Sequence, residues 1–249
     1  MFGPVTAEGG PRRLSRVLAL DDLEAEARRF LPRPIFGYVS GAAEDNVTRD
    51  VNRAAWRRIG FRPRVLRDVS SRHQRRELFG RVHESPFGIA PMGLGAISAY
   101  RADVVMAEGA ATAGLPFCLS GSSLIPLETV AAAAPGSWFQ AYLPGEVSRI
   151  DALLDRVEAA GYEVLVVTVD VPVGGNRENL TRAGFSSPLR PSLRLALDGA
   201  TRPGWIASVM LPTLLRHGMP HFENSFAERG APILSRHVER DFSARDHFD

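Results

Sequence analysis

Short apolar runs alternate with segments of helical spacing between residues 87 and 170. Each run is followed by a turn and then by a stretch whose apolar residues recur every three or four positions. Successive β-then-α units of this kind predict a parallel sheet with right-handed crossovers. The expected strands are Phe87–Ala90, Pro116–Leu119, Trp138–Leu143 and Val164–Val169, and the expected helices are Asp103–Ala113, a segment opening at Pro126, and Val147–Ala160.

Helical patterns also precede this repeat. Asp21 and Glu24 have the spacing of a capping box at the start of one helix, and a second helix is expected over Glu44–Arg58. These helices predict a cap on the N-terminal side of the sheet. The Gly-, Pro- and Arg-rich residues 1–16 are expected to be loose, and an extended stretch after the second helix is expected to form a hairpin at Gly80.

The strand–helix repeat stops at Asp170, and the Pro-, Arg- and His-rich remainder shows no further clear unit. The predicted fold class is therefore α/β, a TIM-type (β/α)8 barrel with only about its first four β/α units and an N-terminal helical cap. We expect a loose tail at 1–16, the cap with the first half of the barrel at 17–179, and an irregular basic and apolar tail at 180–249.

One stretch of the tail, Trp205–Leu215, is strongly apolar and is surrounded by arginines. An apolar patch flanked by Arg can lie on an anionic membrane surface. The same stretch can instead pack against the rest of the protein. The pattern leaves both interpretations open, with residues 180–220 as the candidate membrane contact.

Composition narrows the function classes. The net charge of the 249 residues is only +2, which gives no support for a nucleic-acid partner. The chain contains no lysine, so its own residues cannot perform lysine chemistry. Cys118 is the only cysteine, which excludes an internal disulfide and suits a reducing compartment. The first residues lack the apolar core of a signal peptide, so we expect a cytoplasmic protein.

Polar side chains gather where the expected strands end. Ser120, Gln140, Tyr142 and Thr168 follow or close apolar runs, and Arg177 lies in a nearby glycine loop. The carboxyl ends of parallel barrel strands form the site in this fold class. Hydrogen-bonding groups with one fixed cation suit a flat heteroaromatic ring and a bound anion. Each residue also has a structural interpretation, as a loop cap, a satisfied strand residue, a packing aromatic or a solvated cation.

Six motifs follow one another along the chain: FGYVSGAAED at 36–45, IAPMG at 89–93, LSGSS at 119–123, WFQAY at 138–142, TVDVP at 168–172 and NRE at 176–178. Together they resemble the FMN-dependent α-hydroxy acid dehydrogenases and oxidases, over about residues 15–225. The tail segments LDGATRPGW at 197–205 and RHGMP at 216–220 look most like the membrane-associated mandelate and lactate dehydrogenase branch.

The resemblance implies FMN as cofactor and a small 2-hydroxy acid as substrate, oxidised to a 2-keto acid. It places Tyr142 and Arg177 on the substrate, and Phe36 where many members carry a substrate-binding Tyr; Tyr38 is expected to be a packing residue. It also implies peripheral attachment at the inner membrane face and a homo-oligomer. The implied flavin-binding residues are Pro91, Met92 and Gly93 through their backbone, and Ser120, Gln140 and Thr168 at the ring edge.

Other family features are missing from these 249 residues. None of the six histidines precedes Gly-Gly, as the family's catalytic base does, and the family's lysine near the flavin is absent. We therefore expect weak or no FMN binding and no useful turnover from a truncated enzyme. The alternative is a non-catalytic binding or membrane-docking half-barrel, and a third possibility is that a separate polypeptide supplies the missing half.

Overall fold

A three-stranded parallel sheet forms the centre of the protein. The computed structural model describes residues 17–143, 145–169, 175–187 and 189–234. In the sheet, β4 lies between β3 and β5, and the register pairs Ser120 with Gln140 and Gln140 with Val166. The parallel sheet predicted from the apolar runs is therefore confirmed. The strands are β3 (Cys118–Ser120), β4 (Trp138–Ala141) and β5 (Leu165–Val167).

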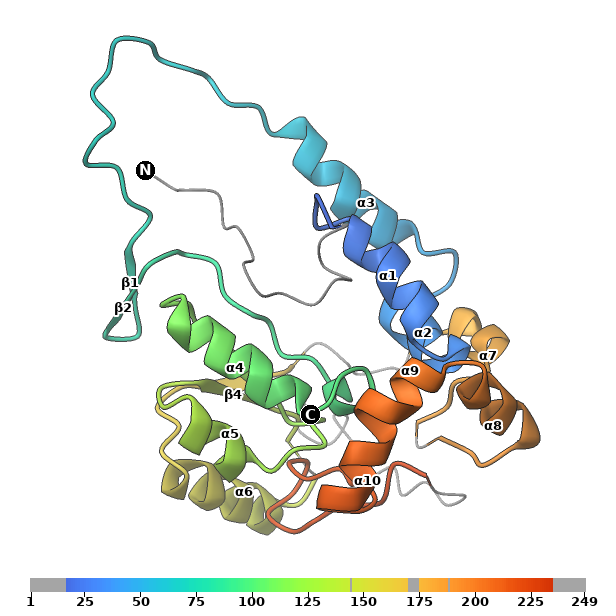
Figure 1. The fold of residues 1–249 in the computed structure, drawn as a ribbon. Coiled ribbons are helices and arrows are strands. Elements are labelled where there is room, and N and C mark those ends of the chain that lie inside the picture. Colours follow the sequence, from blue (N-terminus) through green and yellow to red (C-terminus); the bar gives the residue numbers. More distant parts are fainter. Residues whose placement is uncertain (1–16, 144, 170–174, 188, 235–249) are drawn as a thin grey trace.

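Three helices pack against this sheet (Figure 1). They share one apolar core with the strands, built around the fully buried Leu119, Phe139 and Leu153. Burial of such side chains contributes roughly 1.5–3 kcal/mol each, so this core fixes the strand ends relative to one another. The helices are α4 (Ala102–Thr112), α5 (Leu127–Ala133) and α6 (Val147–Ala159), close to their predicted positions.

The first expected strand, Phe87–Ala90, is reduced to a single parallel bridge between Ile89 and Phe117. The Ile89 amide donates to Pro116, and the Ile89 carbonyl accepts from Cys118. Pro91 has no N–H to continue the ladder. The predicted strand is thus present in position but not in length.

The N-terminal cap is helical, as predicted. The expected capping box at Asp21 is wrong, because Asp21 has helical backbone angles and makes no capping hydrogen bond. Asp22 instead accepts from the Leu18 and Ala19 amides, while Asp21 and Glu24 both pair with Arg53. The cap comprises α1 (Asp22–Phe30), α2 (Arg33–Ser40), α3 (Val47–Ala55) and the 3-10 turn η2 (Trp56–Arg58).

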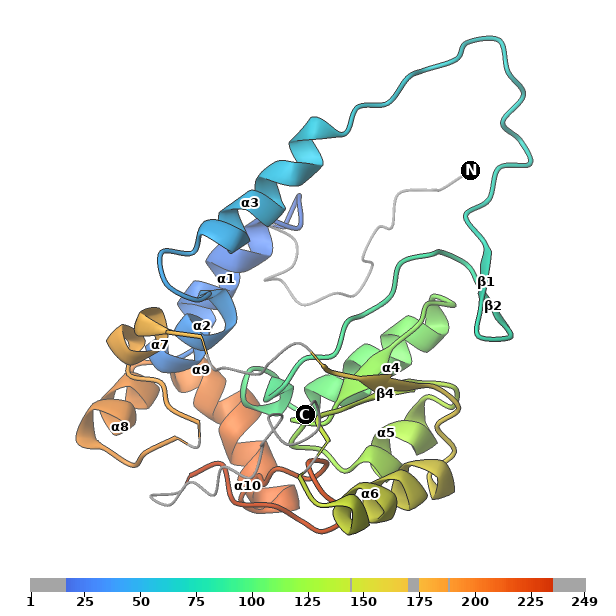
Figure 2. The same cartoon turned by 180° about the vertical axis from the view of Figure 1, so that it is seen from behind.

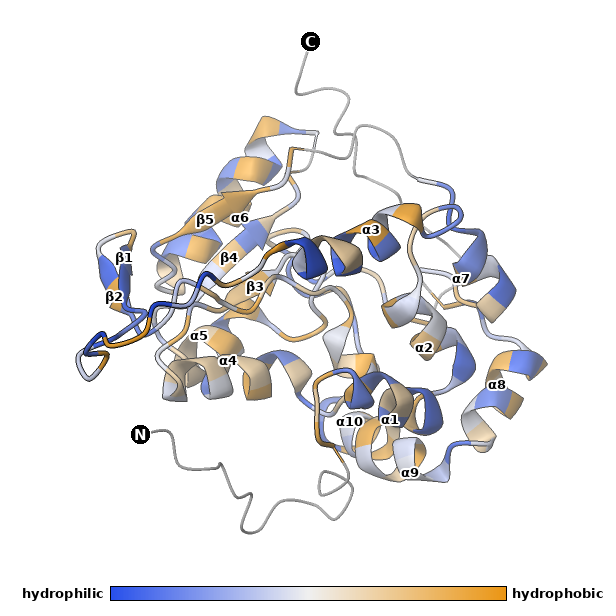
Figure 3. Cartoon of the chain, turned by 90° about the horizontal axis from the view of Figure 1, so that it is seen from above, coloured by the Kyte–Doolittle hydropathy of each residue, from blue (hydrophilic) through white to orange (hydrophobic). Residues whose placement is uncertain are grey.

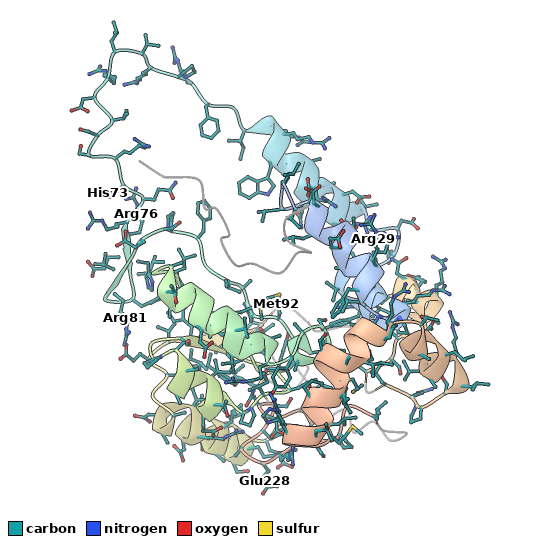
Figure 4. The ribbon with its side chains drawn as sticks, in the orientation of Figure 1. Arg29, His73, Arg76, Arg81, Met92 and Glu228 are labelled. Carbon is teal, nitrogen blue, oxygen red and sulfur yellow. The ribbon has the colours of Figure 1, made fainter. Side chains whose placement is uncertain are left out.

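A long extended segment leads from the cap to the sheet. Residues 59–75, called the arm below, run from the end of η2 to a hairpin of β1 (Arg76–Leu78) and β2 (Arg81–His83). Positive φ angles at Phe79 and Gly80 suit a two-residue hairpin turn, so the hairpin predicted at Gly80 is confirmed. Figure 4 shows His73 and Arg76 where the arm meets the hairpin.

The described part of the segment after the sheet contains helices between Glu178 and His217, where the sequence predicted an irregular tail. Helix spacing was hidden in the sequence by the proline at the start of α9 and the π-helical turn of η4. Trp205, Val209 and Ile233 join a second core with the cap, and the Trp205 Nε1 donates to Ile97 at 2.8 Å. The elements are α7 (Glu178–Ala183), α8 (Leu193–Ala200), α9 (Pro203–Trp205), η4 (Ile206–Met210) and α10 (Leu211–His217).

Candidate active site

A row of hydrogen-bonded side chains crosses the carboxyl ends of the three strands. The Ser120 hydroxyl donates to Gln140 Oε1 at 3.1 Å, and Gln140 Nε2 donates to Thr168 Oγ1 at 2.8 Å. Ser120 and Gln140 are both 2% exposed. The sequence predicted that these three residues meet at the strand ends, and the parallel register brings them together.

The backbone around this row is tightly held. The Gly121 amide donates to the Gln140 carbonyl at 2.7 Å, and the Ser122 amide donates to Ser120 Oγ at 3.1 Å. A Cβ on Gly121 would lie 2.9 Å from the Gln140 carbonyl oxygen, so only glycine allows this approach. The loop after β3 therefore fixes the Ser120 hydroxyl toward Gln140.

The loop from Pro91 to Gly93 lies beside the same edge. The Leu94 amide donates to the Ser122 carbonyl at 3.1 Å, which ties this loop to the one after β3. Pro91 and Met92 are exposed, and Figure 4 shows Met92 on the stretch that leads from the hairpin toward α4. A Cβ on Gly93 would lie 3.0 Å from the Ser122 Cβ. These loops present backbone groups next to the buried row.

The cap contributes Tyr38 to this site. Its hydroxyl donates to the Gly93 carbonyl at 3.3 Å, and its ring stacks on Phe185 at 4.6 Å between centroids. Burial raises the pKa of the Tyr38 hydroxyl, while the Arg177 guanidinium opposes that rise and the Tyr142 hydroxyl adds to it. Arg177 and Tyr142 therefore each lie within electrostatic reach of Tyr38.

Close packing of two helices supports this arrangement. Gly37 of α2 lies against Ala183 of α7, with no room for a side chain at Gly37. Arg177 is the residue that precedes α7, and Tyr38 follows Gly37 on α2. The glycine contact thus sets the distance between the helix that carries Tyr38 and the helix that begins after Arg177.

Phe36, the aromatic residue singled out in the sequence, lies elsewhere on α2. Its ring is under the Arg28 guanidinium, 4.7 Å from the centroid to Cζ. Two residues along an α-helix correspond to about 200° of rotation, so Phe36 and Tyr38 face different directions. Tyr38 could have been identified from the sequence only if residues 33–40 had been recognised as a helix, because helical spacing then separates the direction of Tyr38 from that of Phe36.

The histidines within the described residues lie away from this row. The His83 ring meets Trp138 at the amino end of β4, the His217 Nε2 lies 3.0 Å from the Tyr100 hydroxyl, and His73 is on the arm. The Nδ1 of His221 lies 2.8 Å from the Met219 carbonyl oxygen. His237 and His247 fall outside the described residues.

The donor set of the row fits the edge of a flavin ring. An isoalloxazine presents alternating carbonyl and imide groups, and Ser, Gln and Thr side chains with backbone amides can match both kinds. The residues that could hold the ring are Ser120, Gln140, Thr168 and the backbone of 91–93. The positive Arg177, within electrostatic reach of Tyr38, suits a carboxylate.

Comparisons with known proteins identify the relatives of this chain. The model of the FMN-dependent dehydrogenase family matches residues 27–246. L-lactate dehydrogenase of Ectopseudomonas mendocina is 38% identical over 87% of this chain and 56% of its own length. (S)-Mandelate dehydrogenase of Pseudomonas putida is 32% identical over 90% of this chain and 57% of its own length.

The solved structure of a monotopic membrane protein, (S)-mandelate dehydrogenase, matches with a TM-score of 0.75 and 31% identity. The match covers 84% of this chain and 55% of the solved chain. The chain thus spans about half the length of the relatives it matches, and its sheet and helices are part of a (β/α)8 barrel, as predicted. On the family model and these relatives, the chain belongs to the FMN-dependent dehydrogenases.

Proposed function

We propose that the row at the strand ends binds the edge of the FMN ring and that the adjoining cluster binds a small 2-hydroxy acid. The single observation that carries this proposal is the continuous Ser120–Gln140–Thr168 hydrogen-bond row at the carboxyl edge of a parallel sheet. The proposed reaction of the site is oxidation of the hydroxy acid to the 2-keto acid. Bound FMN supplies the acceptor for the two electrons.

The chain's own residues would position both ligands. The Ser120 and Thr168 hydroxyls and the Gln140 amide offer hydrogen bonds from a rigid, buried base, so the ring would bind without reordering them. Arg177 would hold the substrate carboxylate as a charge-assisted pair. Tyr142 and Tyr38 would offer hydroxyls beside that carboxylate. In this proposal Tyr38 takes the role that the family resemblance suggested for position 36.

We infer that the described residues do not include the general base. Among them, His83, His217 and His221 contact other parts of the protein, and the sequence has no lysine. Base catalysis typically contributes ~10²–10⁴-fold to a rate. We therefore propose that residues 1–249 by themselves bind FMN weakly and show no useful turnover of 2-hydroxy acids.

Titration of the 249-residue chain with FMN, followed by flavin fluorescence, tests the binding part. We expect a weak saturable change that is reduced at least ~tenfold in Gln140→Leu, because an apolar side chain cannot replace the amide. Thr201→Val is the matched control, since its hydroxyl bonds Asp198 on the exposed end of α8. Equal titrations for wild type and Gln140→Leu would contradict the assignment of the row.

Turnover is a separate measurement. L-Lactate and (S)-mandelate are offered in turn with excess FMN and an artificial electron acceptor. We expect no rate above that of free FMN. Oxidation of either acid by the 249-residue chain alone would refute the proposed absence of a base.

An anionic membrane surface is a second proposed partner. Leu193, Leu197, Leu211 and Leu215 are exposed on α8 and α10, in a part of the chain rich in arginine. Within the residues the structure describes, no helix has the length and apolarity needed to span a bilayer. A surface-bound segment suits these features, and it would place the protein peripherally on the inner membrane face.

Vesicle co-sedimentation tests the membrane proposal. We expect binding to vesicles that contain phosphatidylglycerol, little binding to pure phosphatidylcholine, and a severalfold loss with the double variant Leu211→Ser/Leu215→Ser. The single variant Leu66→Ser, on the arm, removes a fully exposed leucine from another surface and serves as the control. Equal losses in the two variants would contradict a contact through α10.

A further inference from the structure

A second concave surface lies at the amino end of the strands, whereas the row of Ser120, Gln140 and Thr168 crosses their carboxyl ends. It is a pocket of about 400 Å³ between the β1–β2 hairpin and the ends of α4 and α5, called the hairpin pocket below. Phe117 and Ser137 line it, and each directly precedes a strand. The pocket is therefore distinct from the candidate active site.

The arrangement of the elements separates the two sites. Figures 1 and 2 both show β1 and β2 beside the end of α4. In the view from above, the hairpin lies on one side of the sheet, while α2 and α7, which flank the candidate active site, lie on the other (Figure 3). A ligand in the hairpin pocket would thus bind without contacting Tyr38 or Arg177.

The hairpin is fixed around the pocket by contacts on two sides. The Glu84 amide donates to the Gly114 carbonyl at 2.9 Å, just beyond α4. The Arg81 guanidinium makes a bidentate pair with Glu163 at 2.9 and 2.8 Å, two residues before β5. These contacts join the hairpin to the ends of elements that share the buried core, so the pocket has fixed walls.

Two glycines shape the wall of the pocket. Gly114 and Gly136 line it with φ angles of 66° and 87°, which side chains rarely adopt. A Cβ on Gly114 would lie 2.8 Å from the Glu84 Cγ, and a Cβ on Gly136 would collide with the Arg81 guanidinium. The Nη1 of Arg81 thus lies against Gly136, while its Nε and Nη2 hold Glu163.

His83 is the unusual member of the lining. It is 8% exposed, and its Nε2 has no hydrogen-bond partner within the part of the chain that the structure describes. Buried polar atoms are nearly always hydrogen-bonded, so a ring nitrogen left without a partner needs an explanation. A ligand group that bonds this nitrogen from the pocket would remove the cost of leaving it unpaired.

The lining defines the class of ligand. Its polar part includes the Arg81 guanidinium, which only donates, and the His83 imidazole, which can donate from Nε2. Two donors in the wall of a largely apolar pocket suit a carboxylate, which only accepts, on a compact hydrocarbon body. The apolar part of the lining is Ala107, Ala111, Leu115, Phe117 and Ala134.

We propose that the hairpin pocket is a second binding site, which takes a small carboxylic acid with a compact apolar body. The carboxylate accepts from the Arg81 Nη1 and the His83 Nε2, and the body lies against the alanine, leucine and phenylalanine side chains. Glu163 competes with the ligand for the charge of Arg81. The inference rests on the cavity, the unpaired ring nitrogen and the donors, and it does not depend on the proposed function.

Calorimetric titration of the 249-residue chain tests this site, with cyclohexanecarboxylate as the probe. Cyclohexanecarboxamide has the same body without the charge, and acetate has the charge without the body. We expect saturable binding of cyclohexanecarboxylate and at least ~tenfold weaker binding of the other two, because each lacks one kind of contact.

Variants locate the bound probe. Ala111→Leu fills part of the pocket from an exposed position on α4, and Arg81→Gln removes the guanidinium; each should weaken binding at least ~tenfold. Glu163→Gln is the matched control, because it breaks the same ion pair but keeps the guanidinium, and it should bind the probe at least as tightly as wild type. Arg177→Gln, in the candidate active site, should leave binding unchanged.

Magnetic resonance of isotope-labelled histidine gives an independent measurement. The ring resonance of His83, assigned by its loss in His83→Phe, should shift as the probe saturates the chain. The proposal fails if the probe does not bind saturably, if Ala111→Leu binds it as wild type does, or if the His83 resonance stays unchanged at saturation. Loss of binding in Arg177→Gln would place the acid at the strand ends, and equal losses in Arg81→Gln and Glu163→Gln would refute the contact with Arg81.

Discussion

The Gln140 side chain joins two strands, because its Nε2 donates to the Thr168 hydroxyl at 2.8 Å while its Oε1 accepts from Ser120. Gln140 is 2% exposed, so water cannot replace a lost partner. A buried amide without a partner costs about 1–3 kcal/mol. The row is therefore a structural element of the sheet as well as the candidate contact for a ring.

Thr168→Val should lower the free energy of unfolding by about 1–3 kcal/mol, because it removes the acceptor of the Gln140 Nε2. Urea unfolding measures the change. A double-mutant cycle combines Thr168→Val, Gln140→Leu and the double variant. It should show a coupling energy above ~0.5 kcal/mol, as expected for residues in contact. Additive losses would mean that the hydrogen bond is absent in solution.

Replacing two helical glycines by alanine should change the stability of the protein in opposite directions. Gly37→Ala drives a methyl group into Ala183 and should destabilise the protein by about 1–3 kcal/mol. Gly109→Ala, on α4 with open space around it, should stabilise it by about 0.5–1 kcal/mol through helix propensity. The midpoint of thermal unfolding should fall in Gly37→Ala and rise in Gly109→Ala.

Gly37→Ala should also change the site, because it separates the α2 and α7 helices that carry Tyr38 and follow Arg177. Binding of a 2-hydroxy acid or 2-keto acid, measured by calorimetry, should weaken in Gly37→Ala and stay unchanged in Gly109→Ala. If the two variants bind alike, the helix contact does not position the cluster.

The polar residues at the strand ends could be predicted because their placement depends on local sequence patterns. Apolar runs that finish in Ser120, Gln140 and Thr168 place these residues in register once the sheet is parallel. Tyr38 was not found as a site residue because its position depends on α2, in which Pro34 and Gly37 obscure the helical pattern. The contact of Gly37 with Ala183 joins segments nearly 150 residues apart along the chain, and no periodicity signals it.

The tail illustrates the same limit. The sequence leaves open whether the apolar stretch that begins at Trp205 packs on the protein or contacts a membrane, and the structure buries part of it and exposes the rest. Trp205 and Val209 are buried in the second core, whereas Leu211 and Leu215 are exposed on α10. Which face of a helix is covered depends on the partner element, here Ile97 and its neighbours, and not on the composition of the stretch itself.

A buried carboxyl should give the protein a specific pH dependence. Asp103 is 1% exposed in the first turn of α4, and burial raises its pKa above 3.8, although the hydrogen bond from the Ser123 hydroxyl opposes this rise. The folded state then holds the proton more tightly than the unfolded state. Stability should fall as the pH rises from 3.8 through the raised pKa.

Asp103→Asn removes this titration and serves as the reference. The difference in unfolding free energy between wild type and Asp103→Asn should move in favour of Asn with rising pH across that window, and then level off. Urea unfolding between pH 3.5 and 7 measures it. A difference that stays constant, or that favours Asp at higher pH, would mean that the folded protein does not raise the pKa of Asp103.

Asn224 should be among the most sensitive positions of the tail. It is fully buried, its Oδ1 accepts from the Leu127 amide at 2.8 Å, and its Nδ2 donates to the Ile125 carbonyl at 2.8 Å. These bonds hold the start of α5 and the end of the loop that begins at Ser120. Asn224→Ala leaves the Leu127 amide without its partner, at about 1–3 kcal/mol, while the Ile125 carbonyl keeps the longer bond from the Ser123 hydroxyl at 3.3 Å.

Asn176→Ala is the matched control, because the Asn176 side chain is exposed and its backbone carbonyl, which accepts from Glu44, is retained. The control should change the unfolding free energy by less than ~0.5 kcal/mol. Hydrogen exchange adds a local measurement, since the Leu127 amide should lose protection in Asn224→Ala and keep it in Asn176→Ala. Equal protection in the two variants would show that the tail does not hold the loop, and the row at the strand ends would then depend on the sheet alone.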